Sequence, residues 1–511
     1  MTDWTSGYVA DIGYTYGYYG ELNPLRARLA LLNARLALPE VRTACELGFG
    51  QGISTNIHAA GSTTRWHGND FNPSQANFAQ RLAGSFSNGP QLSDESFAEF
   101  CIRDDLPDFD YIGLHGIWSW VSDENRAIIV DFLRRKLKVG GVLYVSYNTQ
   151  PGWAPMIPVR NLMAQHADTM APAGAGVAAR VDGALAFAKK LWAANPAFAR
   201  SNPQIEMRLK DLDGQGANYL AHEYFNRDWV PMSFADVAGW LAPAKLEFAC
   251  SATYLEHLPN IHLTPEQSAL LDELPDPVFR QCVRDFMVNQ LFRRDYWVKG
   301  PCQLSHLECA EQLRAQRVVL TAPPESINMT IQGALGPATL SDAVYKPLLK
   351  VMGDHKVRSM GEIELALRES RITLPQLHQA AMVLADKGAL AAVADEATIA
   401  TARPQTEQLN RVLLDRARGS DDISYLASPV AGAGVRVSRF IQLFILAIQA
   451  GKSTPEEWAA YVWAILKSQQ QAVVKDGVAL QGDHANLDEL TKYATEFREH
   501  RLALLRALGV F

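Results

Sequence analysis

The sequence lacks the cysteine pattern of a zinc-bound or disulfide-stabilised protein. Its 511 residues contain six cysteines, and no two of them form a Cys-x-x-Cys pair. A structural zinc site is therefore not expected, and thiols scattered over a long chain are typical of a reducing compartment. We expect no metal and a cytoplasmic location.

Long apolar runs and a secretion signal are also missing. No stretch approaches the roughly 18 apolar residues that a membrane helix needs. Phe440–Ile448 comes nearest, but it is short and interrupted by Gln442. The first twenty residues are polar and aromatic, without the basic and apolar regions of a signal peptide. We therefore expect neither a membrane span nor secretion.

The chain has no excess of positive charge. Its 48 Lys and Arg stand against 55 Asp and Glu, which gives a net charge of −7. A general nucleic-acid binder needs a basic excess to displace counterions from phosphates, so nucleic acid is not an expected partner. Hydrophobic residues make up 48% and charged residues 20%, as in an ordinary globular protein. At roughly 150 residues per domain, the length suggests about three domains.

Strand-like and helical patterns alternate in the first half of the chain, which indicates an α/β domain over residues 1–255 with a helical insertion at about 155–215. Such alternation predicts a parallel sheet covered by helices on both faces, a Rossmann-like arrangement. The expected strands are Val41–Leu47, Trp66–Asp70, Tyr111–Leu114, Val142–Tyr147 and Leu246–Ser251, and the expected helices are Ile53–Ala60, Pro73–Leu82, Arg126–Leu137 and Phe234–Leu241.

The rest of the chain is mostly helical. We expect a helical middle domain over residues 256–340 and a C-terminal helical domain over 341–511. Three helical patterns between Ser341 and Val393 precede a short β-like end, which suggests a winged-helix element, and Pro404–Gln408 predicts a loop. Between Ser341 and Ala400, seven Lys and Arg face eight Asp and Glu, so this element is better suited to contact protein than phosphate.

Three glycines, Gly48, Gly50 and Gly52, lie between the first expected strand and helix. Glycines there let the chain turn sharply and let a ligand approach main-chain atoms. Asp70 follows Glu46 by 24 residues, at the end of the next strand. An acid in that position can accept hydrogen bonds from both hydroxyls of a ribose.

Two features favour S-adenosylmethionine over a dinucleotide. The spacing is G-x-G-x-G, and Glu46 closes the first strand, where its charge would repel a pyrophosphate but suits a sulfonium and an ammonium group. Asp94 and Glu95 follow the probable third strand and could accept from the adenine amino group, while Phe71 adjoins Asp70. The alternative is a purely structural turn with solvated acids.

Longer motifs extend this interpretation. The chain resembles class I S-adenosylmethionine-dependent methyltransferases that carry a methyltransferase regulatory region. Three stretches carry the likeness: Phe109-Asp-Tyr-Ile-Gly-Leu-His-Gly-Ile-Trp-Ser-Trp-Val121, Val145-Ser-Tyr-Asn-Thr-Gln-Pro-Gly-Trp153 and Tyr219-Leu-Ala-His-Glu-Tyr-Phe225. They resemble the family patterns "fDyIiaHGvfSWV", "SYNxxPGW" and "HEYL".

The resemblance covers about residues 40–300, with departures. The usual "GCGxGGN" reads Gly48-Phe-Gly-Gln-Gly-Ile-Ser54 here, and "GIDLSP" reads Gly68-Asn-Asp-Phe-Asn-Pro73. The glycines and the acid are kept, so the resemblance implies the cofactor. The C-terminal half is more weakly similar to rickettsial-type protein-lysine methyltransferases.

Residues at the carboxyl ends of the fourth and fifth strands are the expected catalytic groups, because ligands of open α/β sheets bind there. Each has a structural alternative, such as packing for Trp118, a core position for His115 or a salt-bridged role for His222 and Glu223. Tyrosines near the N-terminus could cover the cofactor. The catalytic candidates are His115, Trp118, Tyr147, Asn148 and His222, and Tyr14, Tyr16 and His115 join the glycine loop and the acids as cofactor candidates.

The leading hypothesis is N-methylation of protein lysines, with a protein substrate as partner. The first alternative is O- or N-methylation of a small molecule or saccharide, with His115 or His222 as general base. The second is a non-catalytic scaffold that keeps the fold. An adenine methyltransferase is disfavoured, because Leu114-His-Gly-Ile117 replaces the D/N-P-P-Y/F motif. The sequence carries no signal of oligomeric state.

Overall fold

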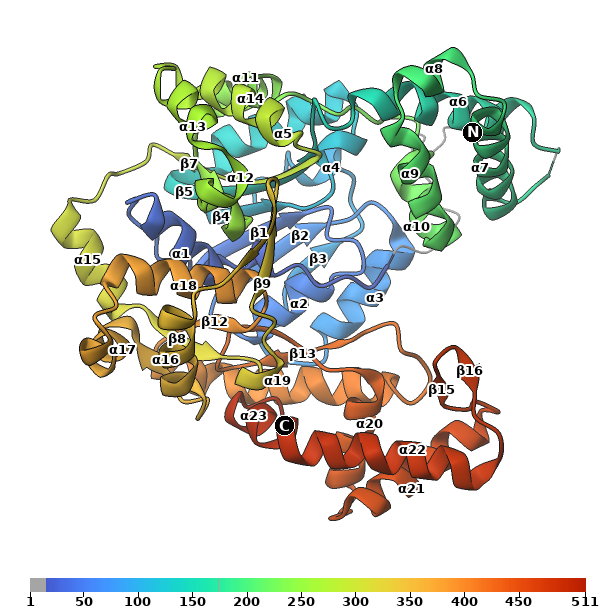
Figure 1. The fold of residues 1–511 in the computed structure, drawn as a ribbon, viewed down its shortest axis with the longest axis vertical. Coiled ribbons are helices and arrows are strands. Elements are labelled where there is room, and N and C mark those ends of the chain that lie inside the picture. The colour runs from blue at the N-terminus through green and yellow to red at the C-terminus, as the bar shows by residue number, and fades with distance from the viewer. Residues whose placement is uncertain (1–14, 173) are drawn as a thin grey trace.

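The computed structural model describes residues 15–172 and 174–511, and within them a seven-stranded sheet forms the centre of the molecule (Figure 1). Its strand order is β3-β2-β1-β4-β5-β7-β6. The strands are β1 (Thr43–Leu47), β2 (Arg65–Asn69), β3 (Gln91–Ser93), β4 (Phe109–Leu114), β5 (Leu137–Asn148), β6 (Leu246–Ser251) and β7 (Phe292–Lys299). Neighbours from β3 to β5 pair in parallel, and β7 runs antiparallel to β5 and β6. The predicted Rossmann-like α/β class is confirmed.

Helices cover both faces of this sheet, because parallel neighbours need crossover connections. Tyr111 and Ile57 belong to the core beneath α1 and α2, whereas the next strand residue, Ile112, packs with Phe132 beneath α5 and α11. The helices around the sheet are α1 (Pro24–Asn33), α2 (Ile53–Ala60), α3 (Pro73–Ala83), α4 (Phe97–Phe100), α5 (Asp123–Lys136) and α11 (Phe234–Leu241).

The inserted helices form a lobe beside the sheet (Figure 1). This lobe has a small core of its own, in which Met163, Val181 and Leu209 are buried. The insertion reaches beyond the expected residue 215, to Tyr224. Its helices are α6 (Ile157–Thr169), α7 (Val177–Ala193), α8 (Ala197–Ser201), α9 (Gln204–Asp211) and α10 (Ala217–Tyr224).

The central sheet is not complete at residue 255, where the first domain was expected to end. After α12 (Pro259–His262), α13 (Pro265–Asp272) and α14 (Pro277–Val288), the chain returns to the sheet as β7. The charged residues of β7 hide its strand character, but they are buried as pairs: Arg293 donates to Asp285 at 2.6 Å and to Asp295 at 2.9 Å. A strand with internal ion pairs does not show the apolar pattern of a central strand.

A three-stranded antiparallel sheet, β11-β8-β12, follows the main domain. It packs with the three helices expected between Ser341 and Val393, in a winged-helix-like arrangement that takes its first strand from residues before 341. The elements here are α15 (His306–Ala315), β8 (Arg317–Leu320), β9 (Thr330–Gly333), β10 (Gly336–Thr339), α16 (Asp342–Met352), β11 (Arg358–Ser359), α17 (Met360–Ala366), α18 (Leu374–Asp386) and β12 (Leu390–Val393).

The C-terminal region is mostly helical, as predicted, but the loop expected at Pro404–Gln408 lies inside a 21-residue helix, α19. The elements are α19 (Glu396–Arg416), β13 (Tyr425–Ser428), β14 (Ala433–Arg436), α20 (Arg439–Gln449), α21 (Pro455–Ser468), β15 (Val474–Lys475), β16 (Val478–Ala479), α22 (Gly482–Glu496) and α23 (Leu502–Ala507). Within the described part of the chain, no helix has both the length and the apolar character to cross a bilayer.

The C-terminal region packs directly on the main domain. Helix α19 and the β13–β14 hairpin both contact α2, and one continuous core joins Ile57 of α2 to Leu409 and Val435. The helix that follows the glycine loop is therefore enclosed by the last third of the chain.

Candidate functional site

The glycine loop turns between β1 and α2 in a conformation that side chains disfavour. Gly48, Gly50 and Gly52 have φ values of 71°, 58° and 66°, all in the left-handed region. A Cβ on Gly48 would lie 2.3 Å from the Ile117 Cδ1 atom, and one on Gly52 would lie 2.5 Å from the Cβ of Ala79. Both the backbone conformation and the space therefore require glycine.

Asp70 follows β2 and fixes this loop. Its Oδ2 accepts the Gly50 amide at 2.8 Å, and its Oδ1 accepts the Asn72 amide at 3.0 Å. Each carboxylate oxygen can still accept another hydrogen bond. Burial raises the pKa of Asp70 to about 7, because a buried carboxylate is poorly solvated.

Glu46 lies on β1, beside Asp70, and is also buried. Thr55 of α2 donates its hydroxyl to the Glu46 carboxylate. Burial, and to a smaller extent the charge of Asp70, raises the pKa of Glu46 to about 8. Two buried acids with raised pKa values provide a site for a ligand that brings positive charge or hydroxyl donors.

The acids after β3 differ from each other. Asp94 is exposed, whereas Glu95 accepts from the Ser93 hydroxyl at 2.7 Å and pairs with Arg103 at 2.9 Å. Phe71, next to Asp70, is half-buried. Roles for Asp94, Glu95 and Phe71 toward an adenine ring stay predictions.

His115, directly after β4, lies among aromatic groups. Its Nδ1 is 2.8 Å from the Tyr144 hydroxyl, and its ring stacks on Tyr19 with centroids 3.7 Å apart. Burial lowers the pKa of His115 to about 4, so its imidazole is neutral at pH 7. A neutral imidazole suits a hydrogen-bonding or stacking role better than that of a strong base.

The N-terminal tyrosines lie in different surroundings, and the prediction that Tyr14 or Tyr16 contacts the cofactor stays a prediction. Tyr14 is outside the described residues, and Tyr16 packs on Phe78 of α3 and below the guanidinium of Arg416. Tyr19 of the same segment covers His115 instead. The density of tyrosines was the only sequence signal for Tyr19.

Two of the expected catalytic residues do not face the strand-end site. Trp118 is completely buried against Trp240, and Tyr147 donates its hydroxyl to buried Asp295 at 2.8 Å. Both side chains belong to the core under α5 and α11. Successive strand residues point to opposite faces, so Tyr144 and Ser146 reach the His115 side and Tyr147 does not.

Asn148 ends β5, where the sequence placed it. It is buried, and its side-chain nitrogen has no hydrogen-bond partner among the described residues. Its backbone amide donates to the Ser119 hydroxyl at 2.9 Å. A buried amide without a partner at this edge of the sheet is available to a ligand.

Helix α10 of the lobe approaches the same region. Tyr219 of α10 lies close enough to Tyr19 for their hydroxyl groups to interact electrostatically, and burial raises the pKa of Tyr219 to about 12. Glu223, one turn along α10, has its pKa raised to about 7 by burial. His222 is buried within the helix, and its carbonyl accepts from Asn226. Tyr219 and Glu223 therefore join His222 as candidates for the acceptor side of the site.

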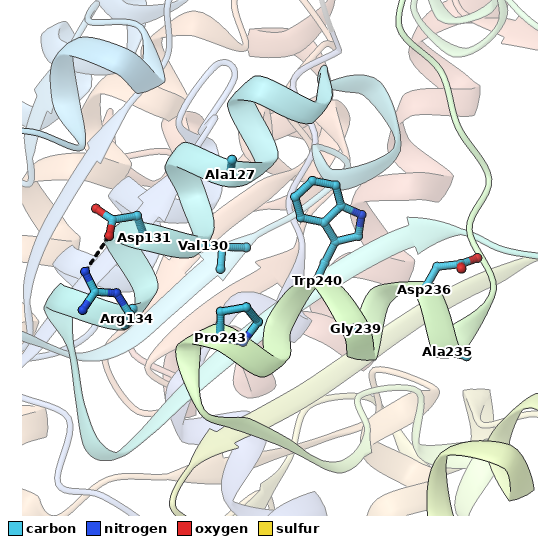
Figure 2. A pocket seen from close by; sticks show the side chains of 9 residues that line it. All are labelled: Ala127, Val130, Asp131, Arg134, Ala235, Asp236, Gly239, Trp240 and Pro243. Atoms are coloured by element: carbon cyan, nitrogen blue, oxygen red, sulfur yellow. Dashed lines mark hydrogen bonds and ion pairs between the residues drawn. The ribbon is translucent and has the colours of Figure 1, made fainter.

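A further groove of about 620 Å³ lies between α5 and α11 (Figure 2). Trp240, Val130 and Pro243 line it, and the Asp131–Arg134 ion pair lies at one side. Because α5 and α11 cover the face opposite α2, this groove is separate from the glycine loop. In residues 15–172 and 174–511, no three His, Cys, Asp or Glu side chains gather as a metal site.

Known proteins share this architecture. Residues 216–299, from α10 to the end of β7, match the family described as a predicted methyltransferase regulatory domain. The uncharacterised protein sll1526 of Synechocystis sp. is 36% identical over 99% of both chains. The structure of PKMT2 from Rickettsia typhi in complex with AdoHcy is similar with a TM-score of 0.68 and 17% identity, covering 95% of this chain and 98% of that one.

This chain belongs to the same family as sll1526, and it carries a methyltransferase regulatory domain on the fold of a class I methyltransferase. The residues that match the regulatory domain do not form a separate structural domain. They contribute α10 to the lobe above the site, then α11 and β6, and finally β7 of the central sheet.

Proposed function

We propose that this methyltransferase transfers the methyl group of S-adenosylmethionine to the side-chain amine of lysine in a protein substrate. The likeness to PKMT2, a protein-lysine methyltransferase by its name, supports this acceptor because it extends over the entire architecture, including the C-terminal half.

The residues of the glycine loop fit the cofactor. Asp70 has acceptor capacity left for ribose hydroxyls, and buried Glu46 can balance positive charge. The left-handed glycines have no side chains that would keep a ligand away from the loop. The cofactor supplies an already activated methyl group on its sulfonium. The protein therefore has to position the acceptor and exclude water.

Helix α10 supplies groups for the amine. An amine of pKa about 10.4 must lose a proton before it can attack, and desolvation favours that loss. Glu223, half-buried with a raised pKa, can receive a proton, and Tyr219 can accept or donate a hydrogen bond beside it. The unpartnered amide of Asn148 lies at the end of β5, where substrates of open α/β sheets bind.

Incubation with labelled cofactor and a panel of bacterial proteins, peptides, saccharides and small amines tests the proposal. We expect label on protein lysines, located by mass spectrometry of the digested product. Label only on saccharides or metabolites would contradict the acceptor and leave the cofactor site intact. No binding of S-adenosylhomocysteine in calorimetry would contradict the cofactor site itself.

A further inference from the structure

A cavity of about 680 Å³ lies where three parts of the chain meet, away from the glycine loop. Residues 18–29 of the methyltransferase domain form one wall. The end of α18 with β12 forms the second, and the β13–β14 hairpin with Arg501 forms the third. This volume is in the range of small-molecule binding sites.

The cavity is positively charged. It is lined by the cations Arg26, Lys387, Arg436 and Arg501 and by the carboxylates of Glu21 and Asp386. Both carboxylates already have cations nearby: Asp386 lies 3.7 Å from Arg26, and Glu21 lies 3.7 Å from Arg294. The cations that remain are Lys387 at the end of α18 and, on the hairpin side, Arg436 and Arg501.

Arg501 is half-buried, and none of the carboxylates in residues 15–172 and 174–511 forms an ion pair with it. It donates one hydrogen bond, to the Arg436 carbonyl at 2.9 Å, and its Nε is buried without an acceptor in the described part of the chain. Burial lowers the pKa of Arg501. The nearby Glu325 is 3.2 Å from the His500 ring instead. Burying a guanidinium without a partner is costly unless a ligand completes its hydrogen bonds.

Aromatic rings lie beside these cations. Tyr425 is directly opposite Arg436 in the hairpin, so both side chains project from the same face. The Tyr425 ring lies 4.8 Å from that of Tyr18, and both tyrosines line the cavity. Small residues such as Gly434 make up much of the remaining wall.

We propose that this cavity binds a phosphorylated small molecule of mononucleotide size, with Arg436 and Arg501 holding the phosphate and Tyr18 and Tyr425 contacting the ring. Arginine forks match phosphate oxygens in charge and geometry, and tyrosine faces accept flat rings.

Such a ligand would act on the methyl-transfer site through one short segment. Tyr18 faces the cavity and its hydroxyl lies 3.0 Å from His58 of α2, while the adjacent Tyr19 stacks on His115. A ligand that moves Tyr18 would also move the adjacent Tyr19, and this movement would couple the two sites. By linkage, the ligand and S-adenosylhomocysteine change each other's affinity by the same factor.

Calorimetry with AMP and with inorganic phosphate, on the full chain without cofactor, tests the cavity independently of methyl transfer. We expect saturable AMP binding, tighter than phosphate, that weakens about tenfold or more in Arg436→Ala and in Arg501→Gln. Arg411→Ala removes an exposed charge of α19 and should bind AMP like the wild type.

Absence of saturable binding of either probe at millimolar concentration would overturn the proposal. So would unchanged AMP affinity in folded Arg436→Ala, a variant whose exposed side chain can be removed even if Arg501→Gln fails to fold. Phosphate binding as tight as AMP would overturn the role of the two tyrosines.

Discussion

The ring of Tyr19 lies on the imidazole of His115, with centroids 3.7 Å apart and planes inclined by 26°. Because His115 follows β4 directly, this stack places the N-terminal segment over the carboxyl edge of the sheet. We take this stack as the place where the N-terminal segment covers the proposed cofactor site.

Removing the ring of Tyr19 should weaken cofactor binding. We expect Tyr19→Ala to raise the dissociation constant of S-adenosylhomocysteine by about threefold to tenfold, since an aromatic contact contributes roughly 0.5–1.5 kcal/mol. Tyr19→Phe should keep most of the affinity. Calorimetry on both variants and on Tyr16→Ala tests which tyrosine covers the cofactor. A larger loss of S-adenosylhomocysteine affinity in Tyr16→Ala would assign that role to Tyr16.

Asp70 should be essential for binding the cofactor. We expect Asp70→Asn to weaken S-adenosylhomocysteine binding by tenfold or more, because hydrogen bonds to a charged group contribute about 1.5–3 kcal/mol. Asp104→Asn, a change at an exposed acid between α4 and β4, is the matched control. Equal dissociation constants for the two folded variants would be incompatible with the assigned site.

The same acid should make the cofactor-free protein less stable at higher pH. With a folded pKa of about 7, against about 3.9 in the unfolded chain, Asp70 holds a proton that the unfolded chain has lost. The free energy of unfolding therefore falls as the pH rises from about 4 to 7, and Glu46 acts in the same direction.

Urea unfolding at pH 5 and pH 8 measures this effect. From pH 5 to pH 8, we expect the free energy of unfolding of the wild type to fall by roughly 1–3 kcal/mol more than that of Asp70→Asn. Parallel pH dependences for the two proteins would show that Asp70 is ionised in the folded state. An acid that costs stability in the free protein is typical of a binding site.

Glu223 should affect the acceptor rather than the cofactor. Under the proposed lysine activity, we expect Glu223→Gln to raise the KM for a lysine peptide or to lower kcat, by about tenfold, because a positioned proton acceptor is lost. Binding of S-adenosylhomocysteine should be unchanged. Glu206→Gln, an exposed acid of the same lobe, should behave as the wild type, and an equal effect of both variants would count against the role of Glu223.

The buried cluster of β7 is predicted to support the sheet. We expect Arg293→Met to lower the free energy of unfolding by about 3–5 kcal/mol, because Asp285 and Asp295 would remain buried without their cation. Arg134→Met breaks an exposed pair with Asp131 and should cost less than about 1 kcal/mol. Similar unfolding midpoints in denaturant would refute this contrast.

The sequence predicted those elements whose patterns are local. The helices Ile53–Ala60 and Phe234–Leu241 and the strand Leu246–Ser251 have the predicted bounds. The order of glycines and acids along the chain likewise placed Gly50 beside Asp70, because parallel strands end at one edge.

Features that depend on distant partners were not predictable in this way. The β7 strand was missed because Arg293 and Asp295 neutralise each other only in the fold. Tyr147 was assigned to the site because the sequence does not tell which face of β5 meets the cofactor. Tyr19 contacts a residue 96 positions away, and no local pattern predicts that contact.

The contact between Gly61 and Gly432 limits how this chain can be divided. A Cβ on Gly61 would lie 2.9 Å from the backbone of Gly432, so the loop after α2 and the hairpin of the last third touch main chain to main chain. A fragment that ended after the central sheet would expose the apolar sides of α1 and α2 to solvent, and it would be prone to aggregate. Catalytic and accessory halves of this molecule are thus expected to be inherited, expressed and lost together.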